Sequence, residues 1–399
     1  MTSHPEVAES PRGAAPGEPA PAGRRFAPEA RYARAMAESR EQEKYRKAIE
    51  RGLSKAFDAR STPTVDVGID DLRWVIFSDH HEGERDGADD FRRCERSYNA
   101  ALAAYLERGY TLVALGDAEE LWECSPAQVL EHYEHTFELE RELHAAGRYV
   151  RFWGNHDDAW RHPGEVEKHL HRSGFEGLDV LQAQKVRVRQ GDATLGLLYL
   201  AHGHQGTANS DRFGWLSRLV VRHVWRPLQR RLNIPSTTPS RDWQLRARHE
   251  AAMFGWACGR PEKPVLITGH THRPVFAGSA PEPKTTRRAA EVERELNTLR
   301  ASPPVDGEKA AALRSEYEYA RAEERRTDRA RPVVPPCYFN TGCCSYGDGD
   351  VTGLELADGE IRLVRWSCSD GAPSRRVLAS DSLADVFATV AGRVAVPSG

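Results

Sequence analysis

The amino-acid sequence predicts a layered α/β fold, and two observations carry this prediction. Short apolar runs, typical of buried strands, alternate along the chain with longer stretches typical of helices. Several of the apolar runs end in polar clusters, as strands do where an open α/β sheet binds its ligand. With 399 residues, of which 39% are hydrophobic, the chain is long enough for one large domain with additions, or for two domains.

The first half of the predicted core contains three strands separated by helices. Residues 72–77, 111–115 and 149–153 are compact apolar runs, and each is followed by a polar loop. Residues 89–108 and 126–146 have the composition and spacing of helices. Strand, polar loop and helix therefore alternate repeatedly, which is the pattern of a layered α/β fold.

The second half of the predicted core contains two hairpins and a further strand. Residues 184–201 contain a run of alternating polar and apolar residues, a turn and a second strand-like run, which predicts a hairpin. Residues 264–268 predict a short strand. The runs 351–356 and 361–366 are joined by Asp358-Gly359, a typical hairpin turn. These elements extend the core to about residue 370.

The predicted domain is flanked by polar segments, in keeping with a mean hydropathy of −0.64. Residues 1–26 are rich in Pro, Ala, Gly and Glu, which predicts a disordered tail. Residues 27–63 are predicted to form a helical leader and residues 64–370 the main domain. Residues 371–399 are predicted to be a polar C-terminal tail with one short helix.

Two stretches inside the domain are predicted to be helical additions. Residues 207–258 indicate a cap-like helical stretch, and its basic amphipathic part, 211–232, is interpreted as a packed cap. Peripheral contact of 211–232 with an anionic membrane surface is the minority hypothesis. Residues 280–332 are highly charged and predict an inserted helical hairpin.

Composition excludes some functional classes and favours a cytoplasmic protein. The net charge of −3 gives no strong sign of a nucleic-acid partner. The seven cysteines are odd in number and form no CxxC pair, so a disulfide framework is not expected. No apolar segment resembles a signal peptide or spans a bilayer. The oligomeric state is not predicted by the sequence.

Five strand-like runs end in residues that bind metal ions. One of them is followed by Gly154-Asn155-His156-Asp157, in which Asn155 offers a carbonyl oxygen. Mixed carboxylate and imidazole ligands favour Mn, Fe or Zn over Ca. Seven ligands are too many for one tetrahedral ion, which predicts two divalent ions that share Asp117. The seven candidates are Asp79, His81, Asp117, Asn155, His202, His270 and His272.

Two adjacent ions predict a reaction class. They lower the pKa of a bridging water and polarise a phosphoryl oxygen, so we expect hydrolysis of a phosphate ester or anhydride by a bridging hydroxide. His156 is set aside from the ligands because it can act as a general acid or stabilise the transition state. The expected substrate is a phosphorylated small molecule or a lipid-linked phosphate.

The same residues resemble the five motif blocks of the calcineurin-like metallophosphoesterases, in the family's order. The blocks are Asp79-x-His81, Gly116-Asp117, Gly154-Asn155-His156-Asp157, His202 and Gly269-His270-Thr271-His272, and the resemblance covers roughly residues 72–367. It implies two packed mixed β-sheets flanked by helices, in four layers. It implies Asp79, His81, Asp117 and His272 on one ion, and Asp117, Asn155, His202 and His270 on the other.

Within this family, two segments are similar to the UDP-2,3-diacylglucosamine pyrophosphatase branch. They are Gly116 to Trp122 and His202-Gly203-His204. That branch usually carries Arg where His156 stands here, and an acidic residue where His204 stands. The Asp-Arg-Gly run typical of Ser/Thr protein phosphatases is missing. Three alternatives therefore remain open: a lipid- or nucleotide-linked pyrophosphatase, a nuclease, and a catalytically silent scaffold.

Four further residues adjoin the predicted ligands. His80 and His204 are interpreted as structural more readily than as substrate contacts. Asp157 is interpreted as a turn or supporting carboxylate, and Arg273 either meets a substrate phosphate or is solvated.

Overall fold

The structure is a computed structural model that describes residues 28–206, 243–277, 335–368 and 371–392. The chain divides into two units, residues 1–44 and 45–399. Helix α1 (Pro28–Asp58) begins in the first unit and ends in the second. Everything that follows concerns the second unit.

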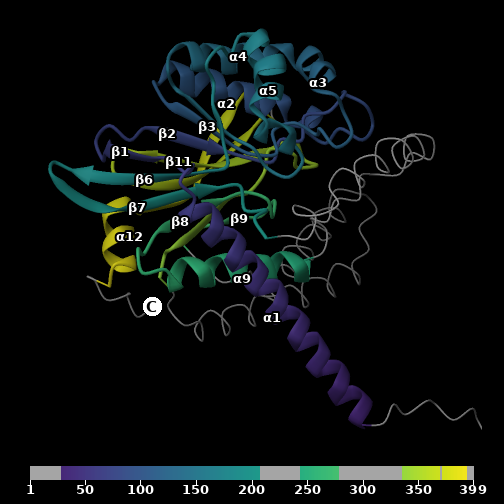
Figure 1. The fold of residues 1–399 in the computed structure, drawn as a ribbon. Coiled ribbons are helices and arrows are strands. Elements are labelled where there is room, and N and C mark those ends of the chain that lie inside the picture. The colour runs from purple at the N-terminus through teal and green to yellow at the C-terminus, as the bar shows by residue number, and fades with distance from the viewer. Residues whose placement is uncertain (1–27, 207–242, 278–334, 369–370, 393–399) are drawn as a thin grey trace, which may run out of the picture. The chain divides into compact units, whose positions relative to one another are not determined.

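Two mixed β-sheets form the centre of this unit (Figure 1). In the first sheet, β7 pairs antiparallel with β6 and parallel with β8, and β8 pairs parallel with β10. Strands β1 and β9 occupy its two edges. The six strands, in spatial order, are β1 (Thr64–Gly68), β6 (Ala183–Gln190), β7 (Ala193–Ala201), β8 (Val265–Thr268), β10 (Tyr338–Thr341) and β9 (Pro274–Val275).

The second sheet has one parallel and one antiparallel half. Strands β2, β3, β4 and β5 are parallel, so the loops that follow them leave the sheet at the same edge. The other three strands continue from β2 in antiparallel pairing. The seven strands, in spatial order, are β13 (Ser374–Ser382), β12 (Glu360–Ser367), β11 (Val351–Ala357), β2 (Trp74–Phe77), β3 (Thr111–Leu115), β4 (Tyr149–Phe152) and β5 (Val180–Leu181).

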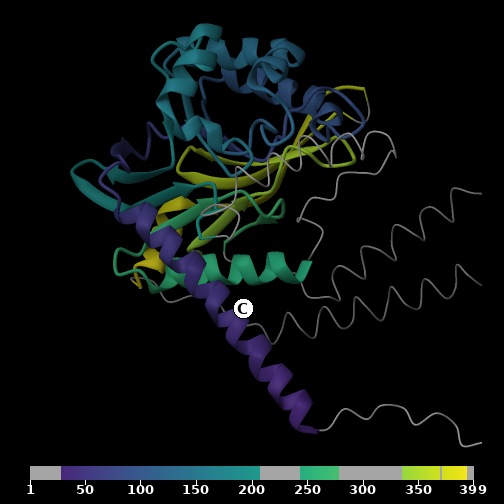
Figure 2. The same cartoon turned by 45° about the vertical axis from the view of Figure 1, so that its right-hand side comes forward.

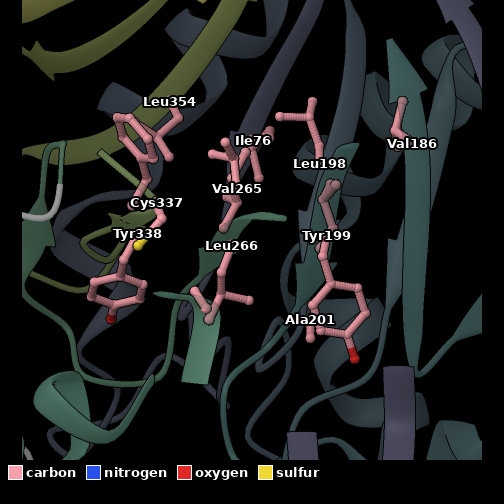
Figure 3. Close-up of a cluster of buried hydrophobic side chains, with 14 of the residues drawn as sticks. Ile76, Val186, Leu198, Tyr199, Ala201, Val265, Leu266, Cys337, Tyr338 and Leu354 are labelled. Carbon is pink, nitrogen blue, oxygen red and sulfur yellow. The ribbon is translucent and has the colours of Figure 1, made fainter. Parts of the chain in front are cut away.

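The two sheets pack against each other through alternating apolar side chains. Ile76 and Leu354 of the seven-stranded sheet belong to one buried cluster with Leu198 and Val265 of the six-stranded sheet (Figure 3). The neighbours of Ile76 on β2 point to the opposite face, which explains why the whole strand is apolar.

Helices cover the outer face of each sheet, which gives four layers (Figure 2). On the seven-stranded sheet, Phe77 packs against Tyr98 of α2 with ring centroids 5.4 Å apart. On the six-stranded sheet, Tyr199 packs against Phe57 of α1 and Trp256 of α9, at 4.9 and 5.4 Å. The helices after α1 are α2 (Glu95–Glu107), α3 (Pro126–His132), α4 (Glu134–Ala145), α5 (Pro163–Glu165), α9 (Trp243–Gly259) and α12 (Leu383–Val390), with short helical turns η1 (Phe91–Arg93), η2 (Asp158–Arg161), η3 (Val166–Leu170) and η4 (His171–Ser173).

The predicted fold class is confirmed: two mixed sheets are flanked by helices. The strands predicted over 72–77, 111–115, 149–153 and 264–268 correspond to β2, β3, β4 and β8. The predicted turn at Asp358-Gly359 is also present, with φ of 57° and 75°. Positive φ at both central positions is the geometry of a type I′ hairpin turn, which matches the twist of the flanking strands.

Two predictions about individual elements are corrected. The helix predicted over 126–146 is two helices, because Tyr133 between them has φ −113° and ψ 30°. Residues 371–399 are not simply a polar tail, because β13 extends the seven-stranded sheet as its edge strand. An edge strand keeps polar side chains, so its sequence resembles a loop. The short helix predicted there is α12, which buries Leu383, Val386, Phe387 and Val390.

Some predictions fall on residues outside the described ranges. These are the tail 1–26, the basic stretch 211–232 and the charged insert 280–332. The last part of the predicted cap, 243–258, lies within α9. Among the described residues, no helix combines the length and the apolar character that crossing a bilayer requires.

Candidate metal centre

The loops after five strands bring the predicted ligands together. Strands β2, β3 and β4 end at one edge of their sheet, and β7 and β8 run parallel in the other sheet. Side chains from both sheets form three groups in which one ligand atom per residue lies within 4.8 Å of the others. These groups are Asp79, His81 and His272; His81, Asp117 and His156; and Asp117, His202 and His270.

Asp79 is the centre of the first group. Its Oδ1 atom lies 3.2 Å from His272 Nε2 and 4.0 Å from His81 Nε2. The same oxygen lies 3.9 Å from His202 Nε2, so it also faces the last group. The Nε2 atoms of His81 and His272 are only 3.1 Å apart. Three imidazoles thus converge on one buried carboxylate oxygen.

Asp117 lies between the other two groups. Its Oδ2 atom is 3.0 Å from His202 Nε2. It also groups with His81 and His156, so it is shared between ligands that come from different loops. His81 also belongs to two of the groups, so the bridging role of Asp117 stays a prediction from the sequence.

Each aspartate uses one oxygen for the backbone and presents the other to the imidazoles. Asp79 Oδ2 accepts hydrogen bonds from Ser78 Oγ and from the His270 amide, the latter at 2.8 Å. Asp117 Oδ1 accepts the His156 amide at 2.7 Å. The carboxylates are therefore fixed in orientation by the loops that carry the other candidate ligands.

The backbone of these loops is held in an unusual conformation. Nine non-glycine residues of the described chain have positive φ, and five of them are candidate ligands. Such conformations cost on the order of 1–3 kcal/mol each, and they cluster at functional sites. The five residues are Asp79 (56°), His81 (54°), Asp117 (51°), His270 (68°) and His272 (54°).

Two motif glycines are required by close approach to the aspartates. A Cβ atom on Gly154 would collide with the carboxylate of Asp117. One on Gly269 would collide with Ser78 Oγ and the carboxylate of Asp79. The motif pairs Gly154-Asn155 and Gly269-His270 are therefore packing requirements of the site as well as turn signals.

The carboxylates make the centre favourable for positive charge. Burial alone lowers the pKa of His202, but Asp117 and Asp79 raise that pKa to about 9. His272 responds in the same way, with burial opposed by Asp79, and its pKa is well above the usual value. Burial raises the pKa of Asp79, but His272 and His202 outweigh it and lower that pKa.

Two buried oxygens support the fit of a metal ion. Asp79 Oδ1 and Asn155 Oδ1 make no hydrogen bond to any residue in the described part of the chain. A buried oxygen without a partner is costly, and a bound cation would satisfy it. The buried Asp and His clusters can therefore hold metal ions.

Glu120 supports the centre and was not identified from the sequence. Its Oε2 atom lies 3.1 Å from His81 Nδ1 and 2.7 Å from His156 Nδ1. One carboxylate thus orients a candidate ligand and the predicted catalytic histidine together. The Trp122 ring stacks on the imidazole of His156, with the ring centroids 4.2 Å apart and the planes 20° from parallel. Only the adjacency of Glu119-Glu120-Leu121-Trp122 to Asp117 could have indicated these roles.

The neighbouring residues are mostly structural. His80 is fully buried against Tyr98 and Phe91, so it does not line the centre. Asp157 accepts the amides of Gly154 and Ala118 at 2.6 and 3.0 Å, as expected of a supporting carboxylate. Arg273 forms an ion pair with Glu250 at 2.7 Å. His204 is buried, with its ring 5.0 Å from that of Trp153.

Comparison with known proteins adds no family. Neither a scan against models of protein families nor a search of curated proteins found a match to this chain.

Proposed function

We propose that the protein is a dinuclear metal-dependent phosphohydrolase that cleaves a phosphate ester or anhydride. The observation that carries the proposal is the convergence of imidazoles on two buried carboxylates. Three histidine Nε2 atoms lie within 4.0 Å of Asp79 Oδ1. Asp117 belongs to two of the three potential ion-binding groups. Paired divalent ions with a shared carboxylate are typical of phosphate hydrolysis.

His270 and His272, which share one loop, would bind different ions. When bound, such ions lower the pKa of a water molecule and polarise a phosphoryl oxygen. The protein itself fixes the ligands through the backbone contacts of Asp79 and Asp117. In the proposal, Asp79, His81 and His272 hold one ion, Asn155, His202 and His270 hold the other, and Asp117 is shared.

His156 is proposed to donate a proton to the leaving oxygen. Burial lowers its pKa, but Glu120 and Asp117 outweigh burial and raise that pKa to about 9 in the metal-free protein. In the metal-free protein these two carboxylates therefore favour the protonated imidazole, which is the form that a general acid requires. The Glu120 carboxylate, whose Oε2 atom lies 2.7 Å from His156 Nδ1, and stacking on Trp122 hold the ring in one orientation.

The test is hydrolysis by metal-stripped protein to which Mn, Zn, Mg or Ni is added back. A chromogenic phosphodiester and a chromogenic phosphomonoester distinguish the two ester classes. We expect turnover that requires metal and that is lost in Asp117→Asn. The matched control is Asp66→Asn, because Asp66 pairs with Arg187 on an exposed part of the six-stranded sheet.

The outcomes separate the proposal from its rivals. Two ions bound per chain with metal-dependent turnover support it. A protein that binds no divalent ion contradicts it and favours a scaffold role. Equal loss of turnover in Asp66→Asn and Asp117→Asn would show that the loss reports folding, and the assignment of Asp117 would be withdrawn.

A further inference from the structure

A pocket of about 380 Å³ adjoins the metal centre. Asn155, a candidate ligand, is part of its wall, as is Trp122, which stacks on His156. The pocket lies entirely within the second unit, and its lining includes Gly52, Lys55 and Ala56 of α1. Its volume falls in the range of about 300–1,000 Å³ that small-molecule sites occupy. A group attached to a phosphate at the centre would therefore extend into this pocket.

Two tryptophans provide flat walls. Trp122 and Trp153 both line the pocket, and both are partly exposed rather than packed in the core. Trp122 is held by its stacking on His156, with 4.2 Å between the ring centroids. Trp153 is held near His204, at 5.0 Å. Indole rings that remain accessible in a pocket stack on planar rings, at roughly 1–3 kcal/mol per nucleobase.

Polar side chains occupy the rest of the wall. Gln205 is 4% exposed, and its Nε2 atom has no hydrogen-bond partner in the described ranges. Its Oε1 atom accepts the Gly203 amide at 3.0 Å, so the unpartnered NH₂ group is fixed in place. Such a donor fits a ring nitrogen or carbonyl oxygen of a ligand. Gln182 adds a second amide to the same wall.

Two basic side chains add positive charge. Lys55 and Arg161 line the pocket and are exposed. Arg161 lies 4.0 Å from Asp158 Oδ2, a distance that leaves its guanidinium able to contact an anion as well. This mixture of amides, cations and the Asp158 carboxylate is unsuitable for an acyl chain, which requires a continuous apolar wall.

We propose that this pocket binds the base and sugar of a nucleotide whose phosphate lies at the metal centre. The inference rests on the proposed phosphohydrolase function and specifies its substrate class. Trp122 and Trp153 stack with the base, and Gln205 donates a hydrogen bond to it. Lys55 and Arg161 make the pocket favourable for an anionic ligand.

The test is calorimetric binding to the metal-loaded full chain. The probes are the non-cleavable methylenephosphonate analogues of AMP and of ribose 5-phosphate, which differ only by the base. We expect the AMP analogue to bind at least tenfold more tightly. Trp153→Leu should reduce that ratio to near one, and Trp153→Phe should restore most of it because a ring is retained.

A charge variant and its control extend the test. Arg161→Ala should weaken both analogues, whereas Arg172→Ala, which alters an exposed arginine outside the pocket, should weaken neither. A ratio that is the same in wild type and Trp153→Leu overturns the inference. Equal affinity of the wild type for both analogues also overturns it.

Failure of the inference is distinguishable from failure of the proposed function. Phosphate release from glycerol 2-phosphate, which has no base, reports the metal centre alone. Release from this ester without base-dependent binding would retain the function and reject the pocket assignment. Base-dependent binding that is lost in Trp153→Leu, with no release from any phosphate ester, would retain the pocket and reject hydrolysis.

Discussion

Two buried polar clusters arise from the same pair of strands, β3 and β4, but they differ in how their charges are balanced. One is the metal centre, with Asp117 after β3 and Asn155 after β4. The other, here called the Arg151 cluster, consists of Arg151, Glu119, Glu140, Tyr98, Tyr149 and Trp160 on the side of the sheet that the helices cover. Asp117 and Glu119 are only two residues apart, yet they belong to different clusters.

The carboxylates of the Arg151 cluster are satisfied without a ligand. Glu119 pairs with Arg151 and accepts Trp160 Nε1 at 2.9 Å. Glu140 accepts the hydroxyls of Tyr98 and Tyr149 at 3.0 and 2.8 Å. All four carboxylate oxygens therefore have partners within the protein, as a structural network requires.

The metal centre lacks such internal balance. Among the described residues, no lysine or arginine forms an ion pair with Asp79 or Asp117, whose charged neighbours are histidines. The carboxylates favour protonated imidazoles in the metal-free protein. Because an imidazole binds a metal ion only in its neutral form, a divalent ion would displace these protons. The difference teaches that burial and charge alone do not mark the candidate site. Its distinguishing feature is a pair of buried carboxylates whose charged neighbours, among the described residues, are imidazoles rather than lysine or arginine.

The largest effect is expected from breaking the metal centre at Asp117. Asp117→Asn removes the carboxylate charge and keeps the shape, so we expect loss of one or both bound ions and of detectable turnover. Metal content per chain by mass spectrometry, with circular dichroism as a check on folding, measures this. Retention of both ions in Asp117→Asn would contradict the shared role.

The Arg151 cluster should respond in stability rather than in metal content. Arg151→Met leaves Glu119 buried without its cation, so we expect a loss of about 3–5 kcal/mol in the free energy of unfolding. Denaturant unfolding of metal-free protein measures it. Metal stoichiometry at saturating ion should stay that of the wild type, and loss of the ions from folded Arg151→Met would show that the clusters are not independent.

A smaller effect is expected at Glu120, which contacts the centre without being a candidate ligand. Glu120→Gln keeps a hydrogen-bonding group but removes the charge beside His81 and His156. Partners of this kind typically contribute 10–100-fold to metal affinity or activity, and we expect a loss in that range. The pH–rate profile should also shift its basic limb to lower pH, because the charge that raises the pKa of His156 is gone.

The smallest effect concerns pH and His80, which packs between the two clusters. Burial, together with Arg151 and despite Asp79, lowers its pKa to about 3. Below about pH 6.5, His80 is protonated in the unfolded state but stays neutral in the folded state. The free energy of unfolding therefore falls by about 1.4 kcal/mol per pH unit as the pH falls from 6.5 toward 3. Urea unfolding at pH 6.5 and 5.5 measures this change. The free energy of unfolding should differ less between the two pH values for His80→Phe than for wild type.

The sequence alone determined the strand positions and the candidate ligands. Strands β2, β3 and β8 are buried on both faces, so they appear in the sequence as short, mainly apolar runs. Residues that follow such runs must lie at a sheet edge, which is why Asp79, Asp117 and His270 could be selected by position alone. Edge strand β13 was missed because its pattern is set by solvent on one side.

Only the tertiary structure decided which polar residues serve the centre and which serve the core. Asp117 and Glu119 are both acidic and both follow β3, and the sequence contains no sign that Glu119 pairs with a buried arginine. The left-handed backbone at Asp117 turns its side chain toward His202, whereas Glu119 meets Arg151 across β4. Glu120 likewise acquires its role from His81 and His156, which lie 39 and 36 positions away in opposite directions along the chain. Charge pairing depends on distances in space, and sequence spacing does not encode distances between loops of two different sheets.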